Sequence, residues 1–239
     1  MRYSLLVGLV ATSGALPLAA QGLPRYEAAQ LACAVFGVRV TTTVTTDMQG
    51  THRVEEVRRD GRLVVHGTAV DSGVAIEAWW DSLALTRRAG GETLTPDAAG
   101  ILGGRYRGLL RPDGRFVRTD APWVPDEVAE VSDLSVALDD LFPADSGVTV
   151  RRLGDSARVQ RYRVQSYRSV DSAATDDRPF AVYESETSDG VVAWGGDGLL
   201  AWDRRVQAET RVKESPQRTF RSVADQRIEL RRLRGCGGT

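Results

Sequence analysis

Two histidines, His52 and His66, are the side chains of this sequence best suited to acid–base chemistry or metal binding. They are fourteen residues apart around a glycine turn, so the two rings could meet across the first predicted hairpins. A zinc site needs three or four ligands, and no nearby cysteine or His-x-His spacing supplies the others. We therefore interpret them as two unrelated, partly exposed histidines, and we expect neither a metal site nor a cofactor.

The segment Gly154-Asp155-Ser156-Ala157 resembles the Gly-Asp-Ser block of a serine esterase family. Such a serine needs a histidine to accept its proton, and in that family the histidine follows the serine in an Asp-x-x-His block. Both histidines of this chain precede Ser156. The segment is therefore predicted to be a turn and a strand start, and the chain is not expected to be an enzyme.

Tryptophans are the more informative candidates. Trp79 and Trp80 are consecutive in a predicted strand, so they point to opposite faces of the sheet. Large aromatic residues usually fill a core, but an indole can also line an apolar cleft, and the sequence leaves both alternatives open. If there is a cleft, the hypothetical ligand-binding residues are Trp79, Trp80, Trp123, Leu138 and Trp202.

The elements that would position these residues are antiparallel hairpins. Asp-Gly dipeptides favour tight hairpin turns, and three of the four in this chain lie between runs that alternate apolar with polar residues; Ser72-Gly73 is predicted to be a further turn. The predicted Asp-Gly turns are Asp60-Gly61, Asp113-Gly114, Asp189-Gly190 and Asp197-Gly198. Strands are predicted at 38–46, 53–59, 62–70, 73–80, 82–88, 105–111, 115–119, 147–153, 157–169, 178–187, 191–194, 199–213 and 218–233.

Two short helices are expected between the strands, one at about 95–104 and one ending at Phe142 before Pro143. In the strand 199–213, one face is predicted to hold Leu200, Trp202, Val206, Ala208, Thr210 and Val212, and Asp203 and Arg205 are predicted to face water. The predicted fold is mainly β: an antiparallel curved sheet, a half-barrel or sandwich, with one or two short helices covering one opening.

The start of the chain has the features of an export signal. Arg2 precedes an apolar run from Leu5 to Leu18, and Leu18-Ala19-Ala20 is suited to cleavage. The apolar run is shorter than a membrane span, and no later segment is long and apolar enough to be one. We predict a signal peptide at 1–20, an N-terminal lead-in at 21–37 and one β domain at 38–236, in a periplasmic or secreted protein.

The only two cysteines, Cys33 and Cys236, lie near the two ends of the predicted domain. An even number of cysteines in an exported chain favours a disulfide. A lipoprotein interpretation competes at Leu31-Ala32-Cys33, but Gln30 stands where a leucine is wanted. The disulfide Cys33–Cys236 is the favoured prediction.

The charges are nearly balanced, with 31 basic and 32 acidic residues. Such a balance gives no electrostatic reason to expect nucleic acid or an anionic membrane as a partner. The expected partner is a hydrophobic small molecule or an envelope protein.

The export signal, the hairpins and the helical insertions together resemble the periplasmic lipoprotein-carrier (LolA-like) architecture, a half-barrel with a helical lid over an apolar cavity. The chain is also similar to exported bacterial β-rich domains of unknown function, through Leu153-Gly154-Asp155-Ser156 and the segment from Gly195 to Leu200. This resemblance implies a non-enzymatic exported domain that binds a hydrophobic ligand between sheet and helices. The alternative is a structural or protein-interaction module of the cell envelope, and an extracytoplasmic hydrolase is the third choice.

Overall fold

The computed structural model describes residues 22–121, 123, 138, 141–142, 147–156, 158–174, 180–215, 218–233 and 235. The predicted signal peptide at 1–20, most of the second predicted helix and Cys236 lie outside these residues. Within the described part of the chain, no helix has the length and apolar character that crossing a membrane requires.

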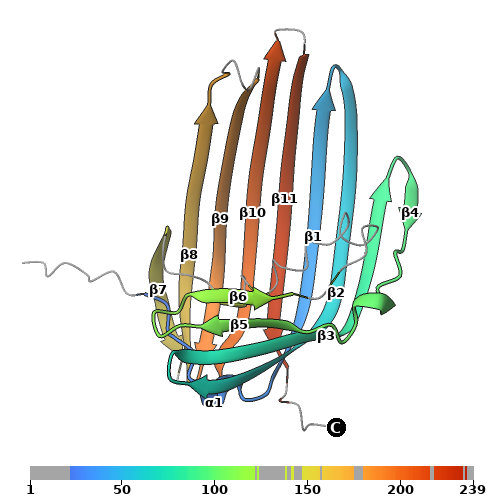
Figure 1. Ribbon diagram of the computed structural model, residues 1–239. Coiled ribbons are helices and arrows are strands. Elements are labelled where there is room, and N and C mark those ends of the chain that lie inside the picture. Colours follow the sequence, from blue (N-terminus) through green and yellow to red (C-terminus); the bar gives the residue numbers. More distant parts are fainter. Residues whose placement is uncertain are drawn as a thin grey trace, which may run out of the picture.

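The described residues form an eleven-stranded antiparallel sheet that curves without closing, which confirms the predicted fold class (Figure 1). They include one α-helix, α1 (Ala28–Leu31), and one 3₁₀ turn, η1 (Ala99–Ile101). The strands are β1 (Ala34–Met48), β2 (Thr51–Val70), β3 (Gly73–Ala89), β4 (Glu92–Leu94), β5 (Tyr106–Leu110), β6 (Phe116–Asp120), β7 (Val148–Ser156), β8 (Val159–Ser172), β9 (Ala181–Gly195), β10 (Gly198–Ser215) and β11 (Arg218–Arg232).

The first and last strands pair with each other at the centre of the sheet. The strand order is β6-β5-β3-β2-β1-β11-β10-β9-β8-β7, and β4 pairs with β3 beside this path. β1 and β11 pair from Phe36 opposite Arg232 to Met48 opposite Phe220. From β1 to β3 and from β7 to β11, strands that pair are also consecutive in the sequence, so both halves of the sheet are built from hairpins. The pairing of β1 with β11 joins the two halves.

The same central pairing brings the two ends of the domain together. The backbone N–H of Leu233 donates to the Val35 carbonyl at 2.7 Å. A Cβ at Gly235 would lie 3.4 Å from the carbonyl oxygen of Cys33. The sequence neighbour of Cys236 is therefore next to Cys33, although the bridge itself stays a prediction because Cys236 lies outside the described residues.

The sheet has two parts that differ in burial, which we call the base and the blade. In the base, the bent strand β3 carries β5 and β6 across the lower ends of β8, β9 and β10, and α1 lies beneath them (Figure 1). The blade consists of the described residues within 41–58, 166–188 and 207–226, and it extends upward as one layer (Figure 1). We call the sheet face that carries Val38 and Val40 the inner face, and the face that carries Arg39 the outer face.

The apolar core lies on the inner face of the base. Phe36, Leu63, Val65, Leu199 and Leu230 are each no more than 1 % exposed. These residues belong to one cluster of buried side chains, which also includes Leu138, Leu141 and Phe142. Most of the other members come from α1 and from β1, β2, β3, β5, β8, β9, β10 and β11. Alternation in β1 sets this pattern, because Phe36, Val38 and Val40 are buried whereas Arg39 between them is exposed.

Two of the four predicted Asp-Gly turns are confirmed, at Asp113-Gly114 and Asp197-Gly198. Gly114 and Gly198 have φ of 84° and 88°, the left-handed region that glycine adopts without a steric cost. The turn at Ser72-Gly73 is confirmed as well. The other two predictions were wrong, since β2 continues through Asp60-Gly61 and β9 continues through Asp189-Gly190.

The course of β2 at Asp60-Gly61 has a packing reason. A Cβ at Gly61 would lie 2.8 Å from the indole of Trp80 and 2.7 Å from the Ser82 carbonyl oxygen, so glycine makes room for the ring. Asp60 points to the outer face, where its carboxylate accepts from Arg39 at 2.7 Å and from Arg58 at 2.6 Å. Within the continuous strand, Gly61 leaves space for the Trp80 ring on the inner face and Asp60 binds two arginines on the outer face.

Asp189-Gly190 repeats this arrangement on the other side of the sheet. A Cβ at Gly190 would lie 2.9 Å from the indole nitrogen of Trp202 and 2.6 Å from the Asp203 carbonyl oxygen. Asp189 pairs with Arg163 on the outer face at 2.6 Å. Because these glycines sit mid-strand, the predicted pairs 53–59/62–70 and 178–187/191–194 are single strands, β2 and β9. Strands 73–80 and 82–88 likewise form one strand, β3.

The helix predictions are confirmed only in part. Residues 95–104 contain the short turn η1, where the Asp97 carboxylate accepts from the Ala99 N–H at 2.9 Å. Of the second predicted helix, Leu138 and Leu141 are helical and buried, and the Phe142 N–H donates to the Leu138 carbonyl at 3.1 Å.

Candidate functional site

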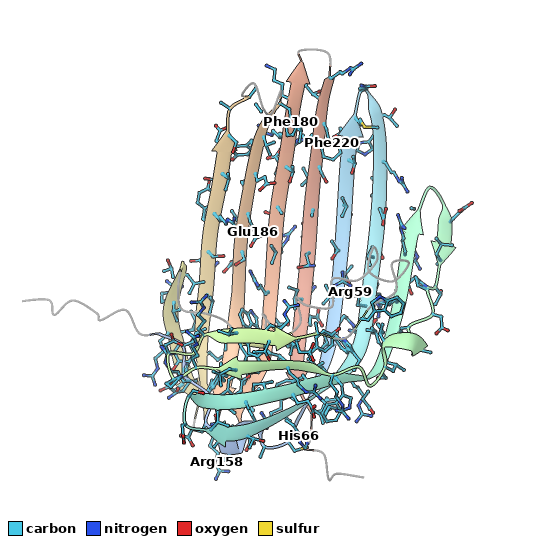
Figure 2. All side chains as sticks on the ribbon, viewed as in Figure 1. Arg59, His66, Arg158, Phe180, Glu186 and Phe220 are labelled. Atoms are coloured by element: carbon cyan, nitrogen blue, oxygen red, sulfur yellow. The ribbon has the colours of Figure 1, made fainter. Side chains whose placement is uncertain are left out.

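The two histidines lie on the same strand and cannot share a ligand. His52 and His66 are fourteen residues apart along β2, which corresponds to about 46 Å of extended chain. His52 Nδ1 is 2.7 Å from the Asp47 carboxylate at the hairpin beside it. The His66 ring stands 5.6 Å from the ring of Trp79, near the bottom of the base (Figure 2). Each histidine therefore makes its own local contact, His52 with Asp47 and His66 with Trp79.

Ser156 lies at the end of β7 with its side chain exposed. Its neighbour Asp155 is engaged by the guanidinium of Arg152, whose Nε donates to Asp155 Oδ1 at 3.0 Å. The Gly-Asp-Ser segment is thus the end of an edge strand tied by an ion pair.

The five residues of the hypothetical ligand-binding set do not converge on one cleft. Trp80, Leu138 and Trp202 are at most 3 % exposed and belong to one core cluster. Trp79 points to the opposite face, where the Arg105 guanidinium lies 3.6 Å from its ring centroid. Trp123 is 79 % exposed. Trp80 and Trp202 therefore fill the base rather than line an open cleft.

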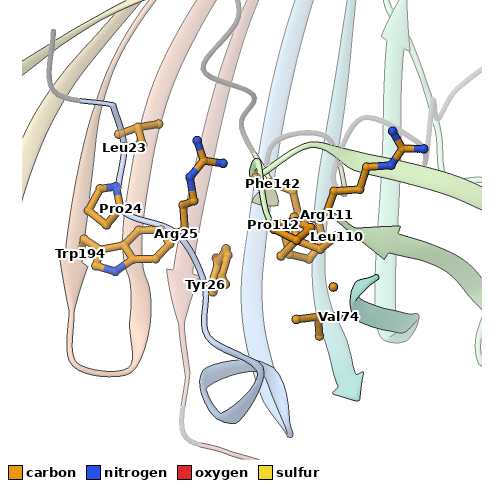
Figure 3. Close-up of a pocket in the computed structure, with 12 residues that line it drawn as sticks. Leu23, Pro24, Arg25, Tyr26, Val74, Leu110, Arg111, Pro112, Phe142 and Trp194 are labelled. Carbon is orange, nitrogen blue, oxygen red and sulfur yellow. The ribbon is translucent and has the colours of Figure 1, made fainter. Parts of the chain in front are cut away.

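The described residues form a partly open, mainly apolar pocket at another place in the base. It lies between the lead-in to α1 on one side and β3, β5 and Phe142 on the other, and its volume is about 150 Å³. Figure 3 shows Pro24, Tyr26 and Trp194 facing Leu110, Pro112 and Phe142 across it. The lining residues are Leu23, Pro24, Arg25, Tyr26, Gly73, Val74, Leu110, Arg111, Pro112, Gly114, Phe142 and Trp194.

Tyr26 combines apolar contacts with one unused polar group. Its ring lies 4.6 Å from the ring of Trp194 and 5.5 Å from the ring of Phe142. Its hydroxyl oxygen is buried and has no hydrogen-bond partner among the described residues. Burial raises the pKa of this phenol well above its ordinary value, against a smaller opposite effect of Arg232. Tyr26 is therefore neutral and is a hydrogen-bond donor at every physiological pH.

The lead-in that forms one wall of the pocket is fixed by α1. The Gln30 side chain accepts from the Glu27 N–H at 2.9 Å and donates to the Gly196 carbonyl at 3.0 Å. Arg232 donates to the Gln30 carbonyl at 2.7 Å, and Leu31 is fully buried. These contacts tie the lead-in to the β9–β10 turn and to β11, so the wall is held from both sides.

Glycine lets the lead-in approach the opposite wall. A Cβ at Gly114, in the β5–β6 turn, would lie 2.3 Å from the Arg25 guanidinium. The turn needs glycine for its positive φ as well. Arg25 thus rests on the turn at the rim of the pocket.

A larger depression of about 640 Å³ on the outer face is chemically different. It is lined mainly by charged side chains that already pair with each other, such as Arg163 with Asp189 and Arg205 with Asp225. A ligand there would have to replace these pairs. The apolar pocket in the base is therefore the better candidate site.

Sequence reasoning missed this site for identifiable reasons. In the sequence, the segment that begins at Leu23 has only the features of a lead-in to the domain. Tyr26 of this segment forms part of the pocket wall, and the rings that it contacts, Phe142 and Trp194, are far away in the sequence. Trp194 and Trp202 flank the same turn, and no local pattern tells which of the two faces a pocket. Pro24 and Tyr26 close to the predicted mature N-terminus were the one available signal that this segment packs against the domain.

Comparisons with known proteins give little further information. No family model matches the chain, and no curated protein matches it. Among solved structures, the chain is similar to an outer membrane channel from Pseudomonas putida, with 10 % sequence identity, 91 % of this chain and 99 % of that chain covered, and a TM-score of 0.26. A TM-score this low carries no argument about fold or function. None of the comparisons shows the resemblance to lipoprotein carriers.

Proposed function

We propose that this protein is an exported binding protein that holds one small, mainly apolar molecule in the pocket between its lead-in and the base of the sheet. The observation that carries the proposal is the pocket itself, a cavity with mainly apolar walls and with Tyr26, Arg25 and Arg111 as the lining residues that carry polar groups. Such a combination of apolar walls and a few placed polar groups is typical of small-molecule sites. The proposal requires no catalytic residue.

The volume limits the part of a ligand that the pocket can hold to about one aromatic ring or an alkyl group of similar size. An apolar cavity of about 150 Å³ in another protein is large enough for benzene. Pockets for drug-sized ligands usually measure about 300–1,000 Å³. The pocket of about 150 Å³ is therefore too small for a whole acyl chain of a lipoprotein. Among the hydrophobic small molecules that the sequence suggested as ligands, the pocket therefore favours those of about the size of one ring.

We propose that a bound ligand reaches the Tyr26 hydroxyl, which is buried in the unliganded structure, and that this contact adds a preference to the size limit. A buried donor without an acceptor loses the free energy of a hydrogen bond, and a ligand that offers an acceptor restores it. We therefore expect a ring that carries a small acceptor to bind more tightly than the same ring without one.

Isothermal titration of two probes tests the proposal, with toluene as the plain ring and benzonitrile as the ring with an acceptor. We expect saturable binding of both probes to the wild-type protein. Val74 is buried and lines the pocket, so Val74→Phe fills the space and is expected to abolish binding of both. Val54→Phe is the matched control, because Val54 is 47 % exposed in the blade. Equal binding to the two variants, or no binding to the wild type, would contradict the proposal and favour the interaction-module alternative.

Tyr26→Phe tests the role of the hydroxyl separately. We expect the variant to bind benzonitrile about three- to tenfold more weakly and toluene with unchanged affinity. If both probes bind Tyr26→Phe as they bind the wild type, the pocket is a ligand site but the hydroxyl does not contact the ligand.

A further inference from the structure

The inner face of the blade changes in polarity along its length. One row of side chains crosses five neighbouring strands in register, from β9 to β2, as Glu184, Thr210, Ser222, Thr46 and Arg53. Side chains directly opposite on adjacent strands share a face, so these five residues form one row. All five are polar, as expected for a sheet layer that is open to solvent. The row before it, nearer the base, is mixed, with Ala208, Ala224 and Val44 between Glu186 and Glu55.

The next row toward the end of the blade is apolar on four strands. It consists of Val182, Val212, Phe220 and Met48 on β9, β10, β11 and β1, paired in register. Met48 is 54 % exposed, and Phe180, two residues before Val182, is 36 % exposed, whereas Val182, Val212 and Phe220 are half-buried. We call these five residues the tip band.

The tip band is remote from the apolar core. Phe180 and Phe220 lie at the top end of the blade, whereas His66 and Arg158 lie at the base (Figure 2). From Val40, the last buried residue of β1, to Met48 the strand extends for about 26 Å. The tip band therefore cannot contribute to the core, and exposed apolar patches of this kind usually mark a contact surface.

Basic side chains stand beside the tip band. The β10–β11 hairpin from Arg211 to Arg221 holds four basic residues and one acidic residue. Lys213 is exposed, whereas Arg211 and Arg221 pair with Glu209. The Arg53 side chain at the neighbouring hairpin is 60 % exposed and lies 3.9 Å from the Glu55 carboxylate. Apolar side chains flanked by cations are the combination that attaches peripheral proteins to anionic membrane surfaces.

The size of the tip band argues against a protein partner. Four strands side by side span about 15 Å, and two residues along a strand add about 7–14 Å, which gives an area on the order of 100–200 Å². A stable protein interface buries about 800 Å² on each side. The band is large enough for shallow insertion of a few side chains between lipid headgroups, and too small for a stable dimer.

We propose that the tip of the blade binds the surface of an anionic lipid membrane, with Met48, Phe180 and Phe220 entering the interface and Arg53 and Lys213 meeting the headgroups. The base and its pocket would then be held away from the membrane by the length of the blade. This proposal is independent of ligand binding in the pocket.

Co-sedimentation with vesicles tests it, using phosphatidylcholine vesicles with and without phosphatidylglycerol. We expect the mature protein to bind the anionic vesicles and to bind the zwitterionic ones at least about tenfold more weakly. Met48→Ser/Phe220→Ser is expected to reduce partitioning about tenfold or more, because two apolar side chains no longer leave water. Val70→Ser/Leu102→Ser is the matched control, since both residues are exposed apolar residues outside the blade, and it should bind as the wild type does.

A charge variant covers the case in which the apolar variant fails to fold. Arg53→Gln/Lys213→Gln should weaken binding to anionic vesicles severalfold, whereas Arg118→Gln/Arg161→Gln outside the blade should not. The proposal is overturned if the wild type binds no vesicle, or if tip and control variants bind equally. It is also overturned if the tip variants abolish a concentration-dependent dimer instead, which would assign the band to contact with a second copy.

Discussion

Val38 and Val44 lie six residues apart on the same face of β1, and their surroundings are opposite. Val38 is 4 % exposed in the base, beneath the layer that β3, β5 and β6 form, whereas Val44 is half-buried in the blade. The pairing partners of β1 are the same strands at both places, β2 and β11. The sheet is therefore one hydrogen-bonded structure with two kinds of side-chain environment.

The difference shows two ways of stabilising a long strand. The base buries apolar side chains against a second layer, which is the main favourable term in folding. The blade has little such burial, and its outer face carries cross-strand ion pairs such as Arg221 with Glu209. Exposed pairs of this kind contribute little individually, so the blade depends on its continuous backbone pairing with the base.

The largest difference between the two parts is expected for the same truncation on β1. Val38→Ala should reduce the free energy of unfolding by about 2–3 kcal/mol, because it removes buried methyl groups and leaves a cavity. Val44→Ala should cost less than about 1 kcal/mol, because the lost contacts are partly replaced by water. Urea denaturation measures both values. Equal losses would mean that the blade is as closely packed as the base.

A smaller effect is expected at the Asp-Gly sites. Gly61→Ala should reduce the free energy of unfolding by about 1–3 kcal/mol, since the new Cβ meets the Trp80 ring and the Ser82 carbonyl. In the Gly61→Ala/Trp80→Leu double variant, the loss due to the alanine should be smaller, because the ring is gone. Gly196→Ala is the control, as a Cβ there meets nothing within 4 Å. Tolerance of alanine at Gly61 would show that the indole does not require glycine beneath it.

The smallest effect concerns the ion pairs of the blade and depends on pH. Arg211 and Arg221, whose Nε atoms lie 2.7 and 2.6 Å from Glu209, lower the pKa of its carboxyl to about 2. A carboxyl with a lowered pKa stabilises the fold above its unfolded-state pKa of about 4.3, and this contribution is lost as the pH falls toward 2. Glu209→Gln should therefore lower Tm by a few degrees at most at pH 7 and have little effect near pH 2.

Thermal scans over this pH range measure that contribution. Glu184→Gln is the matched control, because Glu184 is an exposed carboxyl on the inner face of the blade. The two variants should differ from each other at neutral pH only. A Glu209→Gln effect that persists at pH 2 would assign the loss to packing rather than charge.

The sequence predicted the type of fold but not the course of several strands. In β10 the predicted faces are confirmed for Trp202 and Val206, which are buried, and for Asp203, which pairs with Arg231 on the outer face. Leu200 was predicted on the buried face, but an irregularity between Leu199 and Ala201 shifts the register and buries Leu199 instead. Alternation specifies a face only while the strand stays regular.

The remaining errors come from contacts between distant residues. An Asp-Gly dipeptide has the same local preference in a turn and in a strand. Whether it turns depends on an indole that needs the space above the glycine, and this indole is Trp80 for Gly61 and Trp202 for Gly190. The candidate site was equally hidden, because Tyr26 and Trp194 are brought together by the pairing of β1 with β11. Local patterns contain no information on such pairs.

Hydrogen exchange measured by mass spectrometry, with and without benzonitrile, tests the central claim most directly, which is that the ligand site belongs to the base alone. We predict that the ligand slows amide exchange in residues 22–31, 72–78 and 106–114, which form the pocket walls, and leaves residues 41–54 and 218–226 of the blade unchanged. Slower exchange in the blade, or no change in the pocket walls at saturating ligand, would contradict this account.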